Sequence, residues 1–144
     1  MATARPPRTL DPYAAQFWDF TKERELRLQQ CSSCGKFRFP PSAVCDACLS
    51  EDFEWTQVSG QGKVISWTTF HRAYFPEYPA GHTSVVLELD EGPLFVSYVV
   101  DMEASDLAVD MPLTLRWVDA EDKFGEYFLP VFGPSVGNPQ RFGA

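Results

Sequence analysis

Apolar residues near the start of the chain recur every three or four positions, which is the period of an amphipathic helix. The residues that follow these steps, with a tryptophan beside them, are Tyr13, Phe17, Trp18 and Phe20. Asp11 is a suitable N-cap, and Pro12 is a suitable first helical residue. We therefore expect a helix from Pro12 to about Glu23, within an N-terminal segment that spans residues 1–25.

The aromatic face of this helix allows two interpretations. Phe17, Trp18 and Phe20 could pack on the body of the chain itself, which is the usual role of the apolar face of a surface helix. Alternatively, the same side chains could form an exposed patch that docks a partner protein. Both interpretations stay open at this point.

After the helix the pattern changes to strict alternation of apolar and polar residues, the period of a half-buried strand. Short alternating runs occupy residues 26–29, 37–39 and 53–58. Gly60 and Gly62 then interrupt the pattern, as glycines at a strand end or bulge do. We assign residues 26–59 to a small ribbon of short strands and place a domain boundary at residue 60.

Five longer runs rich in Val, Thr, Phe, Tyr and Trp follow the boundary and predict five strands. They span residues 63–75, 83–89, 94–100, 113–118 and 126–132. The run Asp90-Glu91-Gly92-Pro93 predicts a tight turn, and the polar residues 101–110 leave room for a short helix or turn after the third strand. Five strands with such an insertion match an OB-fold barrel. We expect a mainly β chain, with the barrel at residues 60–132 and a flexible tail at 133–144.

The four cysteines of the chain form two Cys-x-x-Cys pairs within the ribbon. Cys31 and Cys34 make the first pair, and Cys45 and Cys48 make the second. Zinc prefers four ligands in a tetrahedron, and two such pairs on neighbouring hairpins supply them. Gly35 follows the first pair, where the turn commonly needs a positive φ. The sequence therefore predicts one structural zinc ion held by all four cysteines.

Three alternatives to zinc remain: a one-iron centre, redox-active dithiols, and free buried cysteines. If a metal is bound, four protein ligands close its coordination sphere and leave no position for a catalytic water. Every cysteine is then used, so no thiol is left as a nucleophile. The sequence also contains no Gly-x-Ser-x-Gly, His-Glu-x-x-His or phosphate-binding glycine motif. We therefore expect no catalysis by the chain alone.

The net charge of the chain is −8, and the charges are unevenly distributed. Residues 1–45 hold seven Lys and Arg against four Asp and Glu, whereas residues 62–132 hold four against twelve. Affinity for nucleic acid depends on Lys and Arg that meet phosphates, so the acidic barrel argues against this class of ligand. A nucleic-acid-binding protein is nevertheless the alternative function, because OB-folds and zinc ribbons both serve that role elsewhere.

Five further residues are candidates for binding. Arg27, Lys36 and Arg38 lie near the cysteines and are either solvated or grip the phosphates of a nucleotide-linked ligand. His71 and His82, the two histidines of the chain, flank a loop that borders the binding face of an OB-fold. They are either surface histidines or contacts to a ligand or partner.

The sequence indicates a cytoplasmic location. No apolar run approaches the length of about 18 residues that a membrane-spanning helix needs. The first 16 residues contain arginines and prolines but no apolar core of a signal peptide, so we expect no secretory signal. Cysteines in a reducing compartment are available to bind metal.

Several runs together resemble one known family. In the ribbon they are Leu26-Arg27-Leu28-Gln29-Gln30-Cys31-x-x-Cys34-Gly35-Lys36-Phe37-Arg38-Phe39-Pro40-Pro41 and Cys45-x-x-Cys48, after Phe17-Trp18 in the helix. Further on they are Glu54-Trp55, Ser59-Gly60-x-Gly62-x-Val64 and Leu87-Glu88-Leu89-Asp90-Glu91-Gly92-Pro93. This set is similar to the acyl-CoA-associated OB-fold family with an N-terminal rubredoxin-like zinc ribbon. Glu25 stands where the family usually has glycine, and Ser42 where a basic residue often follows the two prolines.

The resemblance implies an accessory subunit of a thiolase-superfamily enzyme that acts on acyl-CoA. Such partners include thiolases and lipid-transfer-protein-like aldolases that cleave steroid or aromatic side-chain CoA thioesters, and some family members are fused to hydratase-like domains. The partner would supply the catalytic residues. This chain would shape the entrance of the partner's active site and could contact CoA, within a hetero-oligomer.

Overall fold

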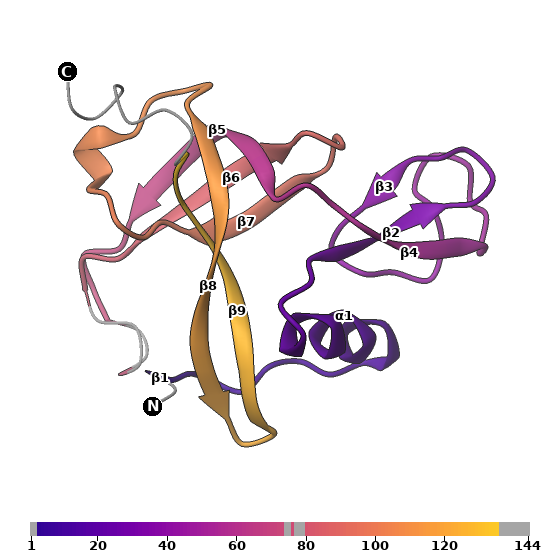
Figure 1. The fold of residues 1–144 in the computed structure, drawn as a ribbon, viewed down its shortest axis with the longest axis horizontal. Helices are drawn as coiled ribbons and strands as arrows, with labels where there is room; N and C mark the ends of the chain where they lie inside the picture. Colours follow the sequence, from indigo (N-terminus) through magenta and orange to yellow (C-terminus); the bar gives the residue numbers. More distant parts are fainter. Residues whose placement is uncertain (1–2, 74–75, 77–79, 136–144) are drawn as a thin grey trace.

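The computed structural model describes residues 3–73, 76 and 80–135. Within these ranges the chain forms one α-helix, one short 3-10 helix and two β-sheets. Figure 1 shows the small sheet on the right, the large sheet on the left, and the helix below and between them. This architecture confirms the expected mainly β fold with an N-terminal helix, a ribbon and an OB-fold barrel.

Helix α1 spans Pro12–Lys22 and begins where the sequence predicts. The Asp11 carboxylate caps it by accepting hydrogen bonds from the backbone N–H groups of Tyr13 (3.0 Å) and Ala14 (2.9 Å). Pro12 follows as the first helical residue, where its missing N–H leaves no hydrogen bond unmade. In the described part of the chain, no helix combines the length and the apolar character that a membrane crossing requires.

The small sheet consists of three antiparallel strands in the order β3 (Phe37–Arg38), β2 (Arg27–Cys31) and β4 (Phe53–Gln57). These strands correspond to the three short alternating runs of the sequence. Gln29 in the central strand is fully buried, and its side-chain amide both donates to the carbonyl of Ser42 and accepts from its N–H, at 2.9 and 2.8 Å. Because both polar ends of Gln29 are paired, its burial fixes the loop after β3 at little cost.

The large sheet contains β1 (Thr3–Ala4), β5 (Gln61–Thr69), β6 (Thr83–Leu89), β7 (Leu94–Tyr98), β8 (Pro112–Asp122) and β9 (Gly125–Pro134). Its order is β1-β8-β5-β6-β7, with β9 paired to β8. A bridge between Val99 and Phe132 brings the end of β7 back to β9. The 3-10 helix η1 (Ala104–Asp106) lies in the insertion between β7 and β8. Five antiparallel strands with this insertion are those predicted for the barrel.

Some strand bounds differ from the sequence-based expectation. β5 ends at Thr69 rather than at residue 75, and Tyr74 and Phe75 lie outside the described residues. β8 and β9 are longer than expected, because their pairing continues without interruption from Leu113–Pro134 to Asp122–Gly125. β9 therefore includes two residues of the expected tail, and the rest of the tail from residue 136 lies outside the described residues.

The alternation pattern does not predict β1, which has only two residues. It pairs in parallel with β8, so that Thr3 lies opposite Ala120. The Arg5 side chain then donates a hydrogen bond of 2.6 Å to the Tyr98 hydroxyl, and the Arg5 backbone N–H donates to the carbonyl of Glu121. The N-terminal segment is thus bound to the barrel before α1 begins.

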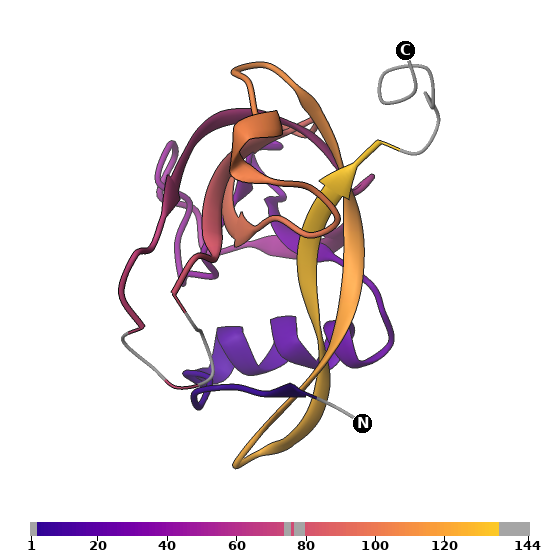
Figure 2. The same cartoon turned by 90° about the vertical axis from the view of Figure 1, so that its left-hand side faces the viewer.

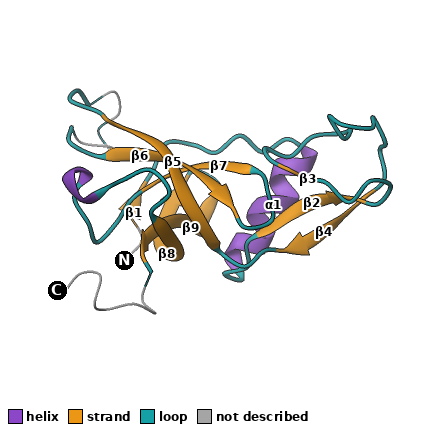
Figure 3. Ribbon diagram, turned by 90° about the horizontal axis from the view of Figure 1, so that it is seen from above, coloured by secondary structure: helices purple, strands orange, loops and turns teal. Residues whose placement is uncertain are grey.

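The helix, the ribbon and the barrel contribute to one hydrophobic core. Its buried side chains include Phe17 of α1, Leu28 of β2, and Phe95 and Phe132 of the barrel. Figure 3 shows α1 between the ribbon and the barrel, and Figure 2 shows the β8–β9 hairpin passing alongside α1. The two sheets therefore pack on opposite sides of the same helix.

The chain passes from ribbon to barrel through Gly60, which has a φ of +77°. This conformation strongly favours glycine. A Cβ atom at this position would lie 2.9 Å from the Cβ of Leu115, while the Gly60 carbonyl accepts a 2.7 Å hydrogen bond from the Leu115 N–H. The glycine at the predicted boundary is thus required by both backbone conformation and space.

Candidate functional site

The four cysteine side chains converge at one point of the ribbon. Their Sγ atoms all lie within 4.8 Å of one another. The Sγ atoms of Cys31 and Cys48 are 3.5 Å apart, and those of Cys34 and Cys45 are 3.6 Å apart. Four sulfurs bound to one zinc ion at about 2.3 Å would be separated by about 3.8 Å in an ideal tetrahedron. The arrangement therefore fits a single tetrahedral metal ion.

Two similar turns place these cysteines. In the first, the Cys31 N–H donates to the carbonyl of Lys36, and the Cys31 carbonyl accepts from Gly35, whose φ is +81°. In the second, the Cys45 carbonyl accepts from Leu49, whose φ is +65°. Gly35 has the positive φ that the sequence predicts. The equivalent position in the second turn is a leucine, which the sequence does not identify as a turn residue.

The thiols alter one another's ionisation. The backbone N–H of Cys34 lowers the pKa of Cys31 to about 6, and the N–H of Cys48 lowers the pKa of Cys45. Two opposing effects act on Cys48. The Ser50 N–H lowers its pKa, but the Cys31 sulfur, burial and the other two sulfurs raise it, and the result is a pKa of about 12. Thiolates so close together repel one another, which disfavours deprotonation of all four cysteines. A cation bound among them would offset this repulsion.

The three basic candidates of the ribbon have different surroundings. Arg27 is paired with Glu25 at 2.7 Å, and Lys36 is paired with Asp46 at 2.9 Å. Arg38 is only 6% exposed: its guanidinium lies against the Phe53 ring and donates to the carbonyl of Ser42. Arg38 is therefore part of the ribbon interior rather than of an exposed basic face, because an aromatic ring and a loop carbonyl cover it.

The aromatic face of α1 packs on the chain itself. Phe17 is 3% exposed and lies between Trp18 and Phe39, with ring centroids 5.1 and 5.4 Å away. Trp18 also contacts Tyr127 of the barrel, and Phe20 contacts Trp55 of the ribbon. Phe17 is therefore a core residue and not an exposed docking contact. The helix joins the two domains through its aromatic side chains.

The two histidines lie in different environments. His71 is exposed at the start of the loop that joins β5 and β6, a loop in which residues 74–75 and 77–79 are outside the described part. The His82 ring is half-buried and stacks on Phe70, with centroids 4.7 Å apart and planes 17° apart. The structure therefore places His82, but not His71, beside a pocket.

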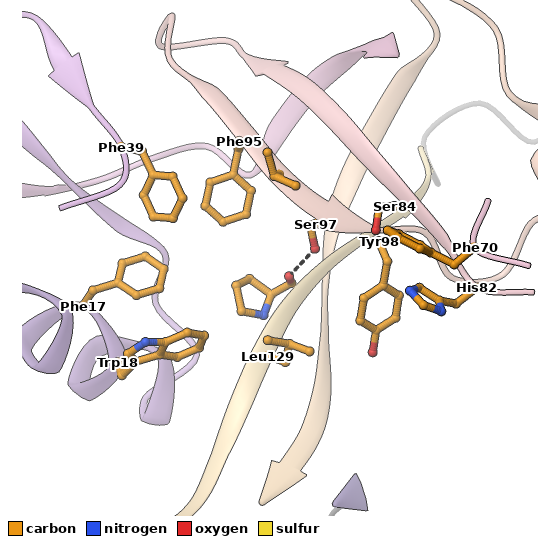
Figure 4. Close-up of a pocket in the computed structure, with 12 residues that line it drawn as sticks. Phe17, Trp18, Phe39, Phe70, His82, Ser84, Phe95, Ser97, Tyr98 and Leu129 are labelled. Atoms are coloured by element: carbon orange, nitrogen blue, oxygen red, sulfur yellow. Dashed lines mark hydrogen bonds between the residues drawn. The ribbon is translucent and has the colours of Figure 1, made fainter. Parts of the chain in front are cut away.

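This pocket has a volume of about 520 Å³ and lies between α1, the ribbon and the barrel (Figure 4). Its lining residues are Phe17, Trp18, Phe39, Phe70, His82, Ser84, Phe95, Val96, Ser97, Tyr98, Leu129 and Pro130. Sequence reasoning does not find it, because its described walls come from six separate segments. Three of the lining residues, Phe17, Trp18 and His82, were singled out from the sequence, but as docking candidates rather than as parts of a pocket.

Two family models match adjoining parts of the chain. Residues 18–54 match the rubredoxin-like zinc ribbon domain of ChsH2. Residues 55–118 match the C-terminal OB-fold domain of ChsH2. The two matches meet within β4, the last strand of the ribbon.

Three curated proteins illustrate the range of relatives. A probable enoyl-CoA hydratase alpha subunit of Thermomonospora curvata is 31% identical over 140 residues, which cover 93% of this chain and 43% of that protein. The 3-oxo-4,17-pregnadiene-20-carboxyl-CoA hydratase alpha subunit of Mycobacterium tuberculosis is 28% identical, over 84% of this chain and 38% of that protein. A DUF35 domain-containing scaffold protein of Methanocaldococcus jannaschii is 30% identical, over 70% and 74%. This chain thus spans less than half the length of either hydratase subunit.

Among solved structures, a chain of the Ltp2-ChsH2(DUF35) aldolase matches with a TM-score of 0.79 and 30% identity, over 92% of this chain and all of that chain. A DUF35-family protein of unknown function from Sulfolobus solfataricus shares the fold, with a TM-score of 0.55 and 16% identity, over 72% of this chain and 77% of that chain. The family models, the relatives and the four-cysteine ribbon agree with the resemblance found in the sequence. The chain therefore belongs to the ChsH2/DUF35 family, in which a rubredoxin-like zinc ribbon precedes an OB-fold domain.

Proposed function

We propose that this chain is a non-catalytic subunit of a thiolase-fold enzyme that cleaves or forms a carbon–carbon bond in a bulky acyl-CoA. The observation that carries the proposal is the match to a chain of the Ltp2-ChsH2(DUF35) aldolase, which extends over the whole of that chain at 30% identity. In this role the chain shapes the entrance of the partner's active site. Its complex with the partner is a cytoplasmic hetero-oligomer.

The metal supports this role structurally. We propose zinc as the ion, bound by Cys31, Cys34, Cys45 and Cys48, because four thiolates in a tetrahedron suit it and complete its coordination. The four cysteines of the sequence are all in the cluster, so a bound zinc ion would leave no thiol for catalysis. The partner must then supply the nucleophile and the acid–base groups.

We further propose that the ribbon contacts the nucleotide end of CoA through Lys36 and Arg27. Half of the Lys36 side-chain surface and about a third of that of Arg27 are exposed, and both can exchange a carboxylate partner for a phosphate. Arg38 is too buried for such a contact in this conformation. In the complex, Lys36→Gln should raise KM for acyl-CoA with kcat unchanged. Lys22→Gln, at the exposed last residue of α1, should change neither constant. An unchanged KM for Lys36→Gln would contradict the contact.

A hydratase complex is a second candidate, because two relatives that cover 93% and 84% of this chain are hydratase alpha subunits. The two candidates differ in the partner and in the reaction, since hydration adds water to a double bond and aldol cleavage breaks a carbon–carbon bond. Assaying the purified complex with an unsaturated and a β-hydroxy acyl-CoA separates them.

The negative charge exposed on the barrel argues against nucleic-acid binding. Asp101, Asp110, Asp119 and Glu121 of the barrel are exposed acids, and they would repel a phosphate backbone. We expect no binding of single-stranded DNA or RNA in a fluorescence-anisotropy titration. Micromolar affinity that falls with added salt would favour the nucleic-acid alternative over the accessory subunit.

The proposed complex can be tested by co-expressing the chain with candidate thiolase-fold proteins of the same organism and measuring the mass by size-exclusion chromatography with light scattering. A species that contains both proteins is expected. We propose the loop that begins at the exposed His71 and the segment after Ser135 as docking surfaces, so His71→Ala or truncation after Ser135 should weaken the complex, and Asp90→Ala should not. If the chain elutes as a separate species from every thiolase-fold protein that is co-expressed with it, the proposal is contradicted.

A further inference from the structure

The proposed function makes no use of the pocket between α1, the ribbon and the barrel. One end of this pocket is apolar and tightly packed. Phe17 and Phe95 in its wall are each 3% exposed and belong to the core. Phe39 joins them, with its ring centroid 4.5 Å from that of Phe95. Because core contacts hold these rings, the apolar wall exists before any ligand arrives, as in most small-molecule sites.

The opposite end of the pocket carries polar groups. His82 and Ser84 lie there, away from α1, with Tyr98 beside them (Figure 4). The Ser97 hydroxyl is already used, because it donates a 2.7 Å hydrogen bond to the Pro130 carbonyl. The lining thus changes from hydrocarbon near α1 to imidazole and hydroxyl groups near the start of β6.

Charge limits what the pocket can hold. Among the described residues, the lining includes no Asp, Glu, Lys or Arg. The Arg5 guanidinium beside the pocket is bound to the Tyr98 hydroxyl, and an ion inside the pocket would lose its hydration without an oppositely charged lining residue, which is costly. A phosphate or a carboxylate is therefore a poor occupant. A volume of about 520 Å³ lies in the usual range for sites that take a small organic molecule.

We propose that this pocket binds an uncharged, mainly hydrocarbon ring compound whose oxygen-bearing end points toward His82 and Ser84. Flat rings pack well against the faces and edges of Phe and Trp side chains, and a single hydroxyl or carbonyl group finds hydrogen-bonding groups at the polar end. The inference goes beyond the proposed function and does not depend on it, because the chain alone supplies every lining residue.

The test uses the full metal-loaded chain without a partner and the fluorescent probe prodan, an uncharged naphthalene ketone. Saturable binding with a blue-shifted emission is expected. Neutral acetylnaphthalene should displace the probe at a concentration about tenfold lower than anionic naphthoate, because the ring is shared and only the charge differs. Absence of saturable binding, or equal competition by the neutral and anionic compounds, would overturn the proposal.

Two exposed residues of β7 locate the binding. Val96 lines the pocket and is 62% exposed, whereas Leu94 is 54% exposed on the same strand and does not line it. Val96→Glu should weaken prodan binding about tenfold, and Leu94→Glu should leave it unchanged, because only the first places a charge at the pocket mouth. Similar effects of the two substitutions would contradict the assignment.

A second pair of variants fills the pocket instead of charging its mouth. Ser84→Leu places a larger side chain in the lining, and Ser66→Leu makes the same change at an exposed position of β5. Thermal unfolding of each variant checks that it is folded. Among folded variants, loss of prodan binding in Ser84→Leu alone supports the pocket, and retention of binding in Ser84→Leu overturns it.

Discussion

Arg8 and Asp122 form a buried two-point ion pair between residues that are 114 positions apart in the sequence. The Arg8 Nε and Nη2 atoms donate to the two carboxylate oxygens at 2.7 and 3.1 Å, and the side chains are 5% and 0% exposed. The guanidinium also lies 3.9 Å from the Tyr127 ring centroid. The pair fastens the N-terminal segment to the end of the β8–β9 hairpin, beside α1.

Arg8→Ala should lower the free energy of unfolding by about 3–5 kcal/mol, because it leaves the Asp122 carboxylate buried without its partner. Urea denaturation followed by circular dichroism measures this change. Lys63→Ala is the control: its ion pair with Glu88 is about half exposed, so the cost should stay below about 1 kcal/mol. Equal losses of unfolding free energy for the two substitutions would show that the buried Arg8–Asp122 pair stabilises the fold no more than an exposed pair does.

The same pair predicts a pH dependence. Arg8 lowers the pKa of Asp122 to about 2, whereas an ordinary aspartate has a pKa of about 3.9. Between these values the unfolded chain binds more protons than the folded one, so the free energy of unfolding falls as the pH drops from about 4 to about 2. Above about pH 5 the stabilisation is complete, and a shift of this size contributes about 2.6 kcal/mol.

Asp122→Asn provides the comparison for this pH dependence, since the amide does not titrate. The difference in unfolding free energy between wild type and Asp122→Asn should be constant above about pH 5 and shrink below about pH 4. Unfolding curves in guanidinium chloride, followed by tryptophan fluorescence at several pH values, measure this difference. A difference that stays constant down to about pH 2 would mean that Arg8 does not lower the pKa of Asp122.

Metal removal should affect the ribbon more than the barrel. Elemental analysis should find about one zinc ion per chain, and Cys34→Ala should lose it. Structural zinc sites of this kind contribute about 10–16 kcal/mol of apparent binding free energy, so the ribbon should unfold while much of the barrel remains. Ser33→Ala, which changes the exposed neighbour of Cys34, should retain the metal. A well-folded ribbon without metal would contradict this prediction.

Phe17 should act as a core residue when it is substituted. Phe17→Ala should destabilise the chain by about 3–5 kcal/mol, because it opens a cavity beside Trp18 where α1 meets Phe39 of the ribbon. Phe20→Ala should cost less, since Phe20 is only half-buried beside Trp55. Thermal unfolding of both variants measures the difference. If Phe17→Ala left stability unchanged and only weakened partner binding, the docking interpretation of the helix would be correct.

Local signals in the sequence were sufficient for much of the fold. Asp11 and Pro12 predict the start of α1 because capping depends on neighbouring residues alone. The two Cys-x-x-Cys pairs predict the cluster because ligand spacing within a turn is fixed by a few bonds. Gly60 has the positive φ that a glycine in a chain break permits, which is a property of one residue. Each of these features requires little knowledge of the rest of the chain.

Features that depend on distant contacts were missed. The β8–β9 hairpin continues through acidic residues of low strand propensity, because Tyr127 packs on Trp18 and Arg8 pairs with Asp122. Arg38 alternates like a surface residue, yet the Phe53 ring covers it. Burial of these side chains is decided by elements far away in the sequence, which no local pattern contains.

The activity of a thiolase-fold partner, measured with and without this chain, tests directly whether the chain is a non-catalytic subunit. Rates of carbon–carbon bond cleavage in a β-hydroxy acyl-CoA are followed for each protein alone and for the purified complex at equal concentrations. We expect no turnover by this chain alone and a large gain in kcat/KM of the partner when the chain is bound. Full activity of the partner without the chain, or turnover by the isolated chain, would contradict this expectation.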